Sequence, residues 1–284
     1  MLNELAPLPN GAIPVAITQA DDARIAPFRD IRERDLIGRH GKFIVEGTVV
    51  LRMLAAAHKA EGDFRADCIL ILKNRLAGVL DILSDFPPDV PVYVADAEVL
   101  DSIVGFHLHR GILALGSRTG TRDMLDTIRS LPETSLVVAG CGISNHDNMG
   151  AMFRNAAAFL ADAVFLDATS CDPLYRKALR VSVGSVLSVP YHRGGNALSM
   201  LEMLAAEGFE IWSLSPSGST EIRQIPRSPR MALVIGTEGD GLPPELLSRF
   251  HSARIAQSPH LDSLNAGTAS GLTLYQMAAA MGRL

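Results

Sequence analysis

The sequence has few cysteines and few aromatic residues. Its 284 residues include three cysteines, Cys68, Cys141 and Cys171, and one tryptophan, Trp212. The cysteines are widely spaced and form no Cys-x-x-Cys pair, so the sequence supports neither a disulfide framework nor a zinc site. We expect buried, reduced thiols. Few aromatics together with abundant alanine, leucine and valine are typical of an α/β protein with a large core.

Long hydrophobic runs and a strong charge of either sign are also absent. Charges or glycines interrupt each apolar run before it reaches the length of a membrane span. Glu4 stands where a signal peptide would carry bases, and we therefore expect a cytoplasmic protein without a membrane partner. The net charge of −5 does not favour a nucleic-acid ligand. Phosphate contact, however, requires only a local basic patch.

Apolar strands alternate with helices along the chain, which predicts an α/β protein with a mostly parallel sheet in its second half. Residues 1–20 contain three prolines and little periodicity, and we expect them to form a flexible arm. A small α/β/α domain is expected over residues 21–116. A second α/β domain is expected over residues 121–284, after the small polar segment 116–120.

Three polar turns in the second domain are the best candidates for a binding site. A strand at 231–235 leads directly into the glycine-rich turn 236–242, which contains Glu238. Ligands of open parallel sheets bind at the carboxyl ends of the strands, where glycines allow the backbone to approach them. The second turn surrounds Asn148, and the third is 263–265. Taken alone, turn 236–242 is equally compatible with a tight connection between a strand and a helix.

The sequence lacks the motifs of other common ligand-binding and metal-binding sites. The sequence has no Gly-x-x-x-x-Gly-Lys-Ser/Thr loop for phosphates. The Gly-Cys-Gly turn at 140–142 lacks the third glycine of a dinucleotide site. His107 and His109 are spaced for one face of a strand and have no acidic cluster beside them, so we expect no metal site.

Arg154 lies about one and a half turns into a predicted helix whose other residues are mainly alanine, methionine and phenylalanine. Asn148 is expected to cap this helix or to lie just before it. An arginine in these surroundings either extends to solvent or pairs with an acid. The functional alternative is a cation directed at a phosphate or at a developing oxyanion.

As a set, these motifs resemble those of the SpoU/TrmH branch of the SPOUT RNA methyltransferases. The family has three sequence motifs, and this chain has a segment similar to each. In order along the chain, the segments are Asn148-x-Gly150-x-x-x-Arg154, Gly236-x-Glu238-x-x-Gly241-Leu242 and Ser263-Leu264-Asn265. Residues 172–185 are similar to the stretch between motifs one and two. The segment Phe43-Ile-Val-Glu-Gly47 is similar to the ribosomal-protein-like RNA-binding domain that many relatives carry in front.

The resemblance implies a trefoil knot in the C-terminal domain, a homodimer and S-adenosylmethionine as methyl donor. It implies that the donor is bound mainly by the backbone, at Leu214, Gly236, Thr237, Ile255 and Leu264. It implies a catalytic group made of Arg154, Asn148, Glu238, Ser263 and Asn265. The expected reaction is methylation of a ribose 2′-hydroxyl in RNA, with Arg154 stabilising the oxyanion.

The expected substrate is RNA, and the two-domain layout favours ribosomal RNA over transfer RNA. Possible phosphate contacts in the N-terminal part of the chain are Arg34, Arg39, Lys73, Arg75 and Arg118, although exposed basic residues mostly serve solvation. The chain departs from the family pattern at Ala256, Gln257 and Pro259, and again after Asn265.

Other functions remain open on this fold. One is a non-catalytic RNA-binding factor of ribosome assembly, in which motif three has decayed. Another is a tRNA 2′-O-methyltransferase, and a third is an enzyme that uses turn 236–241 to bind a small nucleotide. Binding of S-adenosylmethionine separates the first from the enzymes, and activity without RNA identifies the third.

Overall fold

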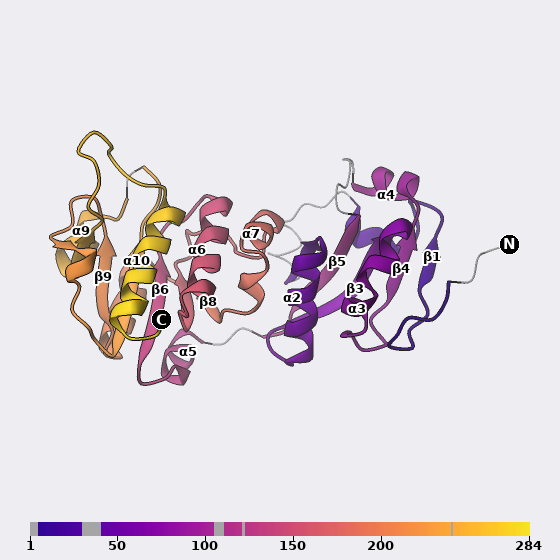
Figure 1. Ribbon diagram of the computed structural model, residues 1–284, viewed down its shortest axis with the longest axis horizontal. Helices are drawn as coiled ribbons and strands as arrows, with labels where there is room; N and C mark the ends of the chain where they lie inside the picture. The colour runs from indigo at the N-terminus through magenta and orange to yellow at the C-terminus, as the bar shows by residue number, and fades with distance from the viewer. Residues whose placement is uncertain (1–4, 30–40, 105–110, 121–122, 240) are drawn as a thin grey trace. The chain divides into compact units, whose positions relative to one another are not determined.

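The computed structural model describes the chain except residues 1–4, 30–40, 105–110, 121–122 and 240 (Figure 1). The chain forms two compact units. One comprises Met1–Thr121 and Leu174–Leu187, and the other comprises Arg122–Pro173 and Ser188–Leu284.

The first unit is built on a five-stranded mixed sheet with the order β1-β4-β3-β5-β2. Its strands are β1 Val15–Ile17, β2 Lys42–Glu46, β3 Phe64–Leu72, β4 Val92–Ala95 and β5 Ile112–Arg118. β1 and β3 pair parallel with β4, whereas β5 pairs antiparallel with both β2 and β3. A Cβ atom on Gly116 of β5 would lie 2.4 Å from the Phe43 ring, so this glycine makes room for the ring.

Helices and a buried cluster complete the first unit. The helices are η1 Ala23–Phe28, α2 Thr48–Lys59, η2 Lys73–Val79, α3 Leu80–Leu83, α4 Ala97–Val104, α7 Arg176–Val181 and η3 Ser185–Leu187. Ile25 and Phe28 are fully buried against Ile44, Leu70 and Leu113 from the sheet. The alternation of strands with helices that the sequence predicts is confirmed in this unit.

Part of the predicted flexible arm is ordered against the sheet. Val15–Ile17 form β1, whose residues pair with those of β4 from Tyr93 to Ala95. Leu8 and Ala12 are buried as well. The prolines of this segment interrupt its apolar pattern, so a short edge strand that depends on the neighbouring β4 had no recognisable sequence signal.

The segment Leu174–Leu187 belongs to the first unit, although the residues before it in the chain, Arg122–Pro173, belong to the second unit. α7 contacts β2, and η3 contacts α2. The carboxylate of Glu46 is buried and lies 3.9 Å from Arg176 Nε and 3.6 Å from Arg180 Nη1. A buried carboxylate needs cationic partners, which is one reason why this segment packs there. A single boundary near residue 120 does not describe this arrangement.

The second unit is built on a seven-stranded sheet with the order β10-β12-β9-β11-β6-β7-β8. Its strands are β6 Ser135–Gly140, β7 Ala163–Leu166, β8 Tyr191–Arg193, β9 Glu210–Leu214, β10 Thr220–Glu221, β11 Arg230–Ile235 and β12 His251–Arg254. Each recorded pairing in this sheet is parallel, as predicted. The central strands read as continuous apolar runs because both of their faces are covered.

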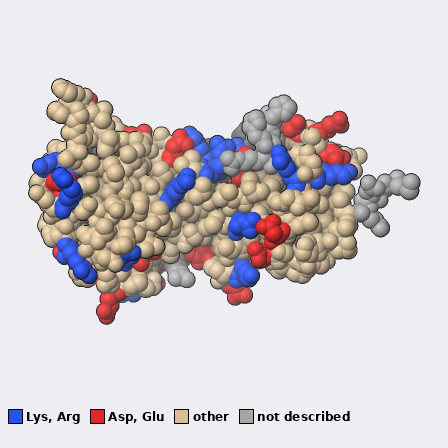
Figure 2. All heavy atoms as spheres, in the orientation of Figure 1, with Lys and Arg blue, Asp and Glu red and all other residues tan. Residues whose placement is uncertain are grey.

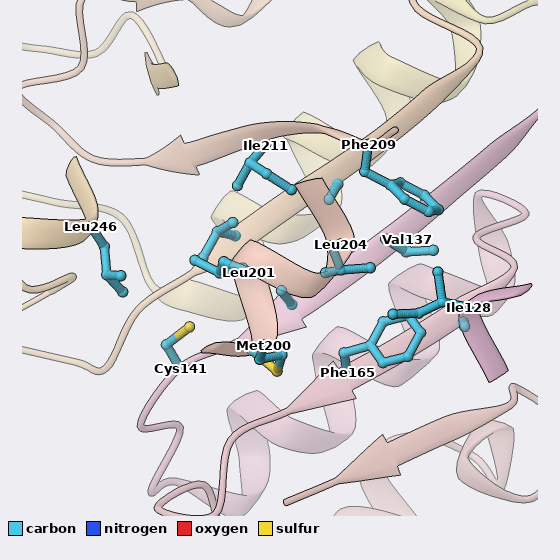
Figure 3. Packing of buried hydrophobic residues seen from close by; sticks show 14 of the residues in the cluster. Ile128, Val137, Cys141, Phe165, Met200, Leu201, Leu204, Phe209, Ile211 and Leu246 are labelled. Carbon is cyan, nitrogen blue, oxygen red and sulfur yellow. The ribbon is translucent and has the colours of Figure 1, made fainter. Parts of the chain in front are cut away.

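The helices of the second unit cover this sheet. They are α5 Met124–Ser130, α6 His146–Ala158, α8 Ala197–Ala206, α9 Pro244–Arg249 and α10 Ala266–Ala280. Side chains of α5, α8 and α9 meet alternate residues of the strands in one buried cluster, which includes Ile128, Met200 and Phe165 (Figure 3). α6 and α10 pack against each other, and they contact β7 and β11 respectively. In the part of the chain that is described, no helix has the length and apolarity needed to cross a bilayer.

Candidate active site

A cavity of about 710 Å³ opens at the carboxyl ends of β9, β11 and β12. Three loops form most of its wall, namely residues 214–217 after β9, 235–242 after β11 and 255–265 after β12. Binding sites of open parallel sheets lie at this edge, and the volume is typical of a small-molecule site. The loop predicted from the glycine-rich turn therefore does line a cavity.

The loop after β11 is folded tightly on itself. A Cβ atom on Gly236 would lie 2.6 Å from the carbonyl carbon of Gly241 and 2.7 Å from the nitrogen of Leu242. Thr237 and Gly241 form a β-bridge at the same point. Gly239 and Gly241 have φ angles of 86° and 67°, which favour glycine. The loop consequently presents its backbone to the cavity, and the exposed Glu238 also lies on the wall.

The loop after β12 contains Ala256, Gln257 and Pro259, at which the chain departs from the family pattern. Ile255 and Gln257 line the cavity. The side-chain amide of Gln257 donates a hydrogen bond of 2.8 Å to the carbonyl oxygen of Leu261, and the amide of Leu261 donates to Ser258 O at 3.2 Å. These two bonds close the loop on itself. Gln257, one of the departures from the family pattern, therefore supplies a side-chain donor that holds this loop together.

The third motif begins α10 and is tied to α6. Asn265 caps α10 by accepting a hydrogen bond from the Thr268 amide, and its Nδ2 donates to Asn148 Oδ1 at 2.8 Å. Asn155 Nδ2 donates to the carbonyl oxygen of Gly267 at 2.7 Å. A Cβ atom on Gly267 would lie 2.7 Å from Ala151 Cβ, so this glycine allows the two helices to approach closely.

Asn148 and Arg154 both lie on α6 but in different surroundings. Asn148 is 5% exposed, and its Nδ2 has no hydrogen-bond acceptor among the described residues. Arg154 is exposed, forms no recorded hydrogen bond or ion pair with the described residues, and is absent from the cavity wall. The structure thus brings Asn148 and Asn265 together but does not bring Arg154 of the same chain to the cavity.

Eight of the ten residues expected to bind the donor or to catalyse the reaction lie on the cavity wall. They are Leu214, Gly236, Thr237, Glu238, Ile255, Ser263, Leu264 and Asn265. The cavity wall also includes Asn145, Ser215 and Ser217, which were not predicted from the sequence. Ser215 and Ser217 directly follow the carboxyl end of β9, so the rule that located turn 236–242 could have found them.

The structure gives no support for a metal or a thiolate at this site. Within the described ranges, no three His, Cys, Asp or Glu side chains are grouped as a metal site would require. Burial, with the carboxylate of Asp167 adding to it, raises the pKa of the Cys141 thiol to about 12. Burial also raises the pKa of Cys171 and of Cys68 to about 11. These thiols are therefore protonated at neutral pH, as expected for reduced core cysteines.

The expected phosphate contacts of the first unit have mixed surroundings. Arg34 and Arg39 lie outside the described residues. Lys73 and Arg75 are exposed at the start of η2, directly after the carboxyl end of β3. Arg118 is half-buried at the end of β5, and its Nε donates to the carbonyl oxygen of Gly120 at 3.1 Å. On the face shown in Figure 2, several basic side chains gather near the middle of the upper edge, and others stand singly among uncharged and acidic ones.

Comparison with known proteins identifies the family. The model of the SpoU rRNA Methylase family matches residues 135–275. The chain is 35% identical over 286 aligned positions to "Uncharacterized tRNA/rRNA methyltransferase Rv0881" of Mycobacterium tuberculosis, covering 94% of this chain and 93% of that protein. It is 30% identical over 195 positions to "23S rRNA (guanosine-2'-O-)-methyltransferase RlmB" of Escherichia coli, covering 66% of this chain and 78% of that one.

Solved structures share the fold. An rRNA methyltransferase from Sinorhizobium meliloti, crystallised with AdoMet, superposes with a TM-score of 0.77 at 21% identity, covering 93% of this chain and 97% of that one. A structure described as an RNA 2'-O ribose methyltransferase superposes with a TM-score of 0.76 at 22% identity. The superposition covers 95% of this chain and 100% of the chain in that structure. With its motifs, its parallel sheet and a relative that is similar over nearly its whole length, the chain belongs to the SpoU family of RNA methyltransferases.

Proposed function

We propose that the protein transfers the methyl group of S-adenosylmethionine to a ribose 2′-hydroxyl of ribosomal RNA. The observation that carries the proposal is the cavity at the carboxyl ends of β9, β11 and β12. Motifs two and three line this cavity, and the bond between Asn265 and Asn148 ties motif one to it. A decayed assembly factor would not need to retain all three motifs in this arrangement.

The residues of the cavity fit S-adenosylmethionine. The volume of about 710 Å³ accommodates a ligand of this size. The close approach of Gly236 to Gly241 leaves backbone groups, not side chains, facing the ligand. We propose that Leu214, Gly236, Thr237, Ile255 and Leu264 hold it. When bound, it supplies an electrophilic methyl group on a sulfonium.

The protein must orient the ribose hydroxyl and stabilise the charge that develops as the hydroxyl loses its proton. A guanidinium stays protonated in proteins, so Arg154 acts as an electrostatic partner of the oxyanion and the adjacent phosphate and not as the base. Asn148 retains a buried amide donor without an acceptor among the described residues, which suits it to orient the substrate or Arg154. Glu238, Ser263 and Asn265 complete the polar wall.

Arg154 reaches this cavity only if another copy of the chain supplies it, and we propose a homodimer for this reason. Leu272 and Tyr275 of α10 and Leu160 after α6 are large apolar side chains that are 47%, 55% and 52% exposed. α10 contains no charged residue, and Figure 2 shows an uncharged surface where α10 lies in Figure 1. A group of exposed large apolar side chains on an uncharged surface is typical of an interface, which supports a second copy covering this face.

Three finer points belong to the proposal. The first unit binds the RNA, with Lys73 and Arg75 as exposed candidates for phosphate contact. The name of the E. coli relative supports ribosomal RNA, whereas the mycobacterial relative is named for both tRNA and rRNA. The second unit carries the trefoil knot expected of this branch, and the loops around β9, β11 and β12 are where we place it.

A complementation assay tests the site and the dimer together. Arg154→Ala should abolish ribose methylation and leave binding of S-adenosylmethionine intact, whereas Gly236→Val should abolish binding. In an equal mixture of the two variants, half of the dimers pair unlike chains, and each of these has one intact composite site. Methylation should therefore recover to about a quarter of the wild-type level. An active Arg154→Ala enzyme, or no recovery in the mixture, contradicts the assignment.

The RNA itself is identified by mapping ribose methylation across total RNA from cells with and without the gene. A missing 2′-O-methyl group in ribosomal RNA supports the proposal. Loss of a tRNA methyl group favours the tRNA alternative. No detectable binding of S-adenosylmethionine in calorimetry favours the non-catalytic assembly factor.

A further inference from the structure

The carboxyl end of β7 carries a buried side chain, Asp167, to which the proposed function gives no role. Its residue is 5% exposed. Oδ1 accepts hydrogen bonds from the Gly142 amide at 3.0 Å, from the Ser170 amide at 3.0 Å and from the Ser170 hydroxyl at 2.6 Å. Oδ2 accepts from the Thr169 hydroxyl at 2.6 Å. Its recorded partners in the described chain are therefore amides and hydroxyls, not a basic side chain.

These bonds hold the four-residue turn 140–143 that follows β6. The Ser170 hydroxyl also accepts from the Ile143 amide at 3.0 Å, and the Cys171 amide donates to Ile143 O at 2.7 Å. Gly142 has a φ of 67°, a conformation that favours glycine. Asp167 orients Ser170, and both side chains bind backbone groups of the turn. Without them, these backbone groups would need hydrogen-bond partners from a neighbouring strand or helix.

The turn connects two parts of the proposed site. It leads into Asn145, which lines the cavity and caps α6 by accepting from the Asp147 amide at 2.8 Å. α6 then presents Asn148 to Asn265. On its other side the turn approaches the loop after β11, because a Cβ atom on Gly142 would lie 3.6 Å from Thr237 Cβ. A shift of this turn would move the start of α6 relative to that loop.

We propose that Asp167 is a positioning residue for methyl transfer, which fixes the 140–143 turn and thereby the placement of Asn145 and Asn148 beside the cavity. This inference rests on the proposed function. Asp167 touches no wall of the cavity and acts only through the turn. Hydrogen bonds to a carboxylate are short and strong, and they hold a loop within the tolerance that catalysis requires.

Two substitutions at Asp167 separate geometry from charge. Asp167→Ala removes all four acceptor contacts, and a displacement of about 1 Å of the turn should lower kcat about 10²-fold. Asp167→Asn keeps Oδ1 for its three donors, and its amide can donate to the Thr169 hydroxyl. We expect it to rescue most of the loss and to stay within about ten-fold of wild type. If charge were the essential property, both variants would lose activity equally, and this result would overturn the inference.

The chain offers two matched controls. Asp162 directly precedes β7, whereas Asp167 directly follows it. The Oδ2 atom of Asp162 accepts a hydrogen bond from the Leu136 amide at 2.8 Å and forms an ion pair with Arg283 at 2.8 Å. Asp162→Asn should lower the melting temperature and leave kcat unchanged, because it acts at the opposite end of the sheet from the cavity. Thr169→Val removes only the contact to Oδ2 and should behave like the wild-type protein.

The readouts include two that need no RNA. Hydrogen exchange should become faster in the peptide that covers residues 140–145 of Asp167→Ala and stay unchanged there in Asp162→Asn. Calorimetry with S-adenosylmethionine should give a Kd within about three-fold of wild type, because Asp167 does not bond the loops of the cavity. A kcat that falls while Kd holds distinguishes positioning from general destabilisation.

Several results would overturn the inference. Exchange over 140–145 that does not respond to Asp167→Ala would do so, as would a kcat loss in Asp162→Asn equal to that in Asp167→Ala. A parallel loss of kcat and S-adenosylmethionine affinity would assign Asp167 a general structural role. If the wild-type protein methylates no RNA, the proposed function fails, while the exchange and calorimetry measurements still decide the role of Asp167.

Discussion

Gly236→Ala is the substitution whose effect on the cavity follows most directly from the structure. The new Cβ atom would lie 2.6 Å from the carbonyl carbon of Gly241 and 2.7 Å from the nitrogen of Leu242. Ordinary contacts between such atoms are about 3.5–4.0 Å, so the two ends of the loop must separate by about 1 Å. The obstacle is the peptide group between Gly241 and Leu242, which no side-chain rotation can move.

The magnitude can be worked out from this displacement. Overpacking of this kind destabilises a protein by about 1–3 kcal/mol. The bridge between Thr237 and Gly241 lies at the point of the clash, so backbone groups of the loop lose their alignment with the ligand. If the displaced loop loses two backbone hydrogen bonds to the ligand, each worth about 0.5–1.5 kcal/mol, binding weakens by about 1–3 kcal/mol. The Kd for S-adenosylmethionine should therefore rise about 5- to 150-fold.

Isothermal calorimetry with S-adenosylmethionine measures this change, and Gly239→Ala is the matched control. Gly239 lies in the same loop with a φ of 86°, and a Cβ atom there meets no atom within 4 Å. That variant suffers backbone strain of about 1–2 kcal/mol but no clash, so its folding stability should fall more than its affinity. Wild-type affinity in Gly236→Ala, or equal affinity losses in the two variants, would refute the steric reasoning.

Two further predictions concern stability. Arg283 is 15% exposed at its side chain, donates to Leu160 O and Thr134 O at 2.6 Å each and pairs with Asp162, so Arg283→Ala should lower the free energy of unfolding by about 2–4 kcal/mol. Chemical denaturation measures this loss of stability. Arg227 is exposed, so Arg227→Ala serves as the control and should leave the free energy of unfolding unchanged. Equal losses of stability in the two variants would contradict the role given to Arg283. Burial raises the pKa of Cys141 to about 12, against about 8.5 for an unfolded thiol, so the folded state binds more protons between these pH values. Stability should be intact below about pH 8.5 and fall as the pH rises toward 12. Cys141→Ala should make this fall less steep, and an unchanged pH dependence would show that the thiol does not contribute.

Local sequence patterns were sufficient for the strands of the second unit's sheet and for two loops of the cavity wall. Its central strands are apolar at successive positions because helices cover both faces of a parallel sheet. Since the carboxyl ends of such strands meet at one edge, the glycine-rich turn after β11 and the polar turn before α10 could be expected at a common site. The pairing partners and the register of the strands could not be read from these patterns.

Contacts between distant residues depended on the tertiary structure alone. Asn148 and Asn265 are 117 residues apart, and only the packing of α6 against α10 makes them neighbours. The same holds for β1, which exists because β4 offers it an edge, and for Asp167, whose partners come from a different strand connection. The position of Arg154 outside the cavity wall of its own chain likewise has no local signature.

The sequence by itself determined the fold class, two of the loops that build the site and, through the resemblance of its motifs, the family, because periodicity, glycine placement and motif order are local properties of the chain. The tertiary structure decided which helices lock these loops together and where the segment Leu174–Leu187 packs. It also decided which buried carboxylate holds the turn before α6. These outcomes depend on burial and hydrogen-bond satisfaction across long sequence separations, which become defined only when the whole core has assembled.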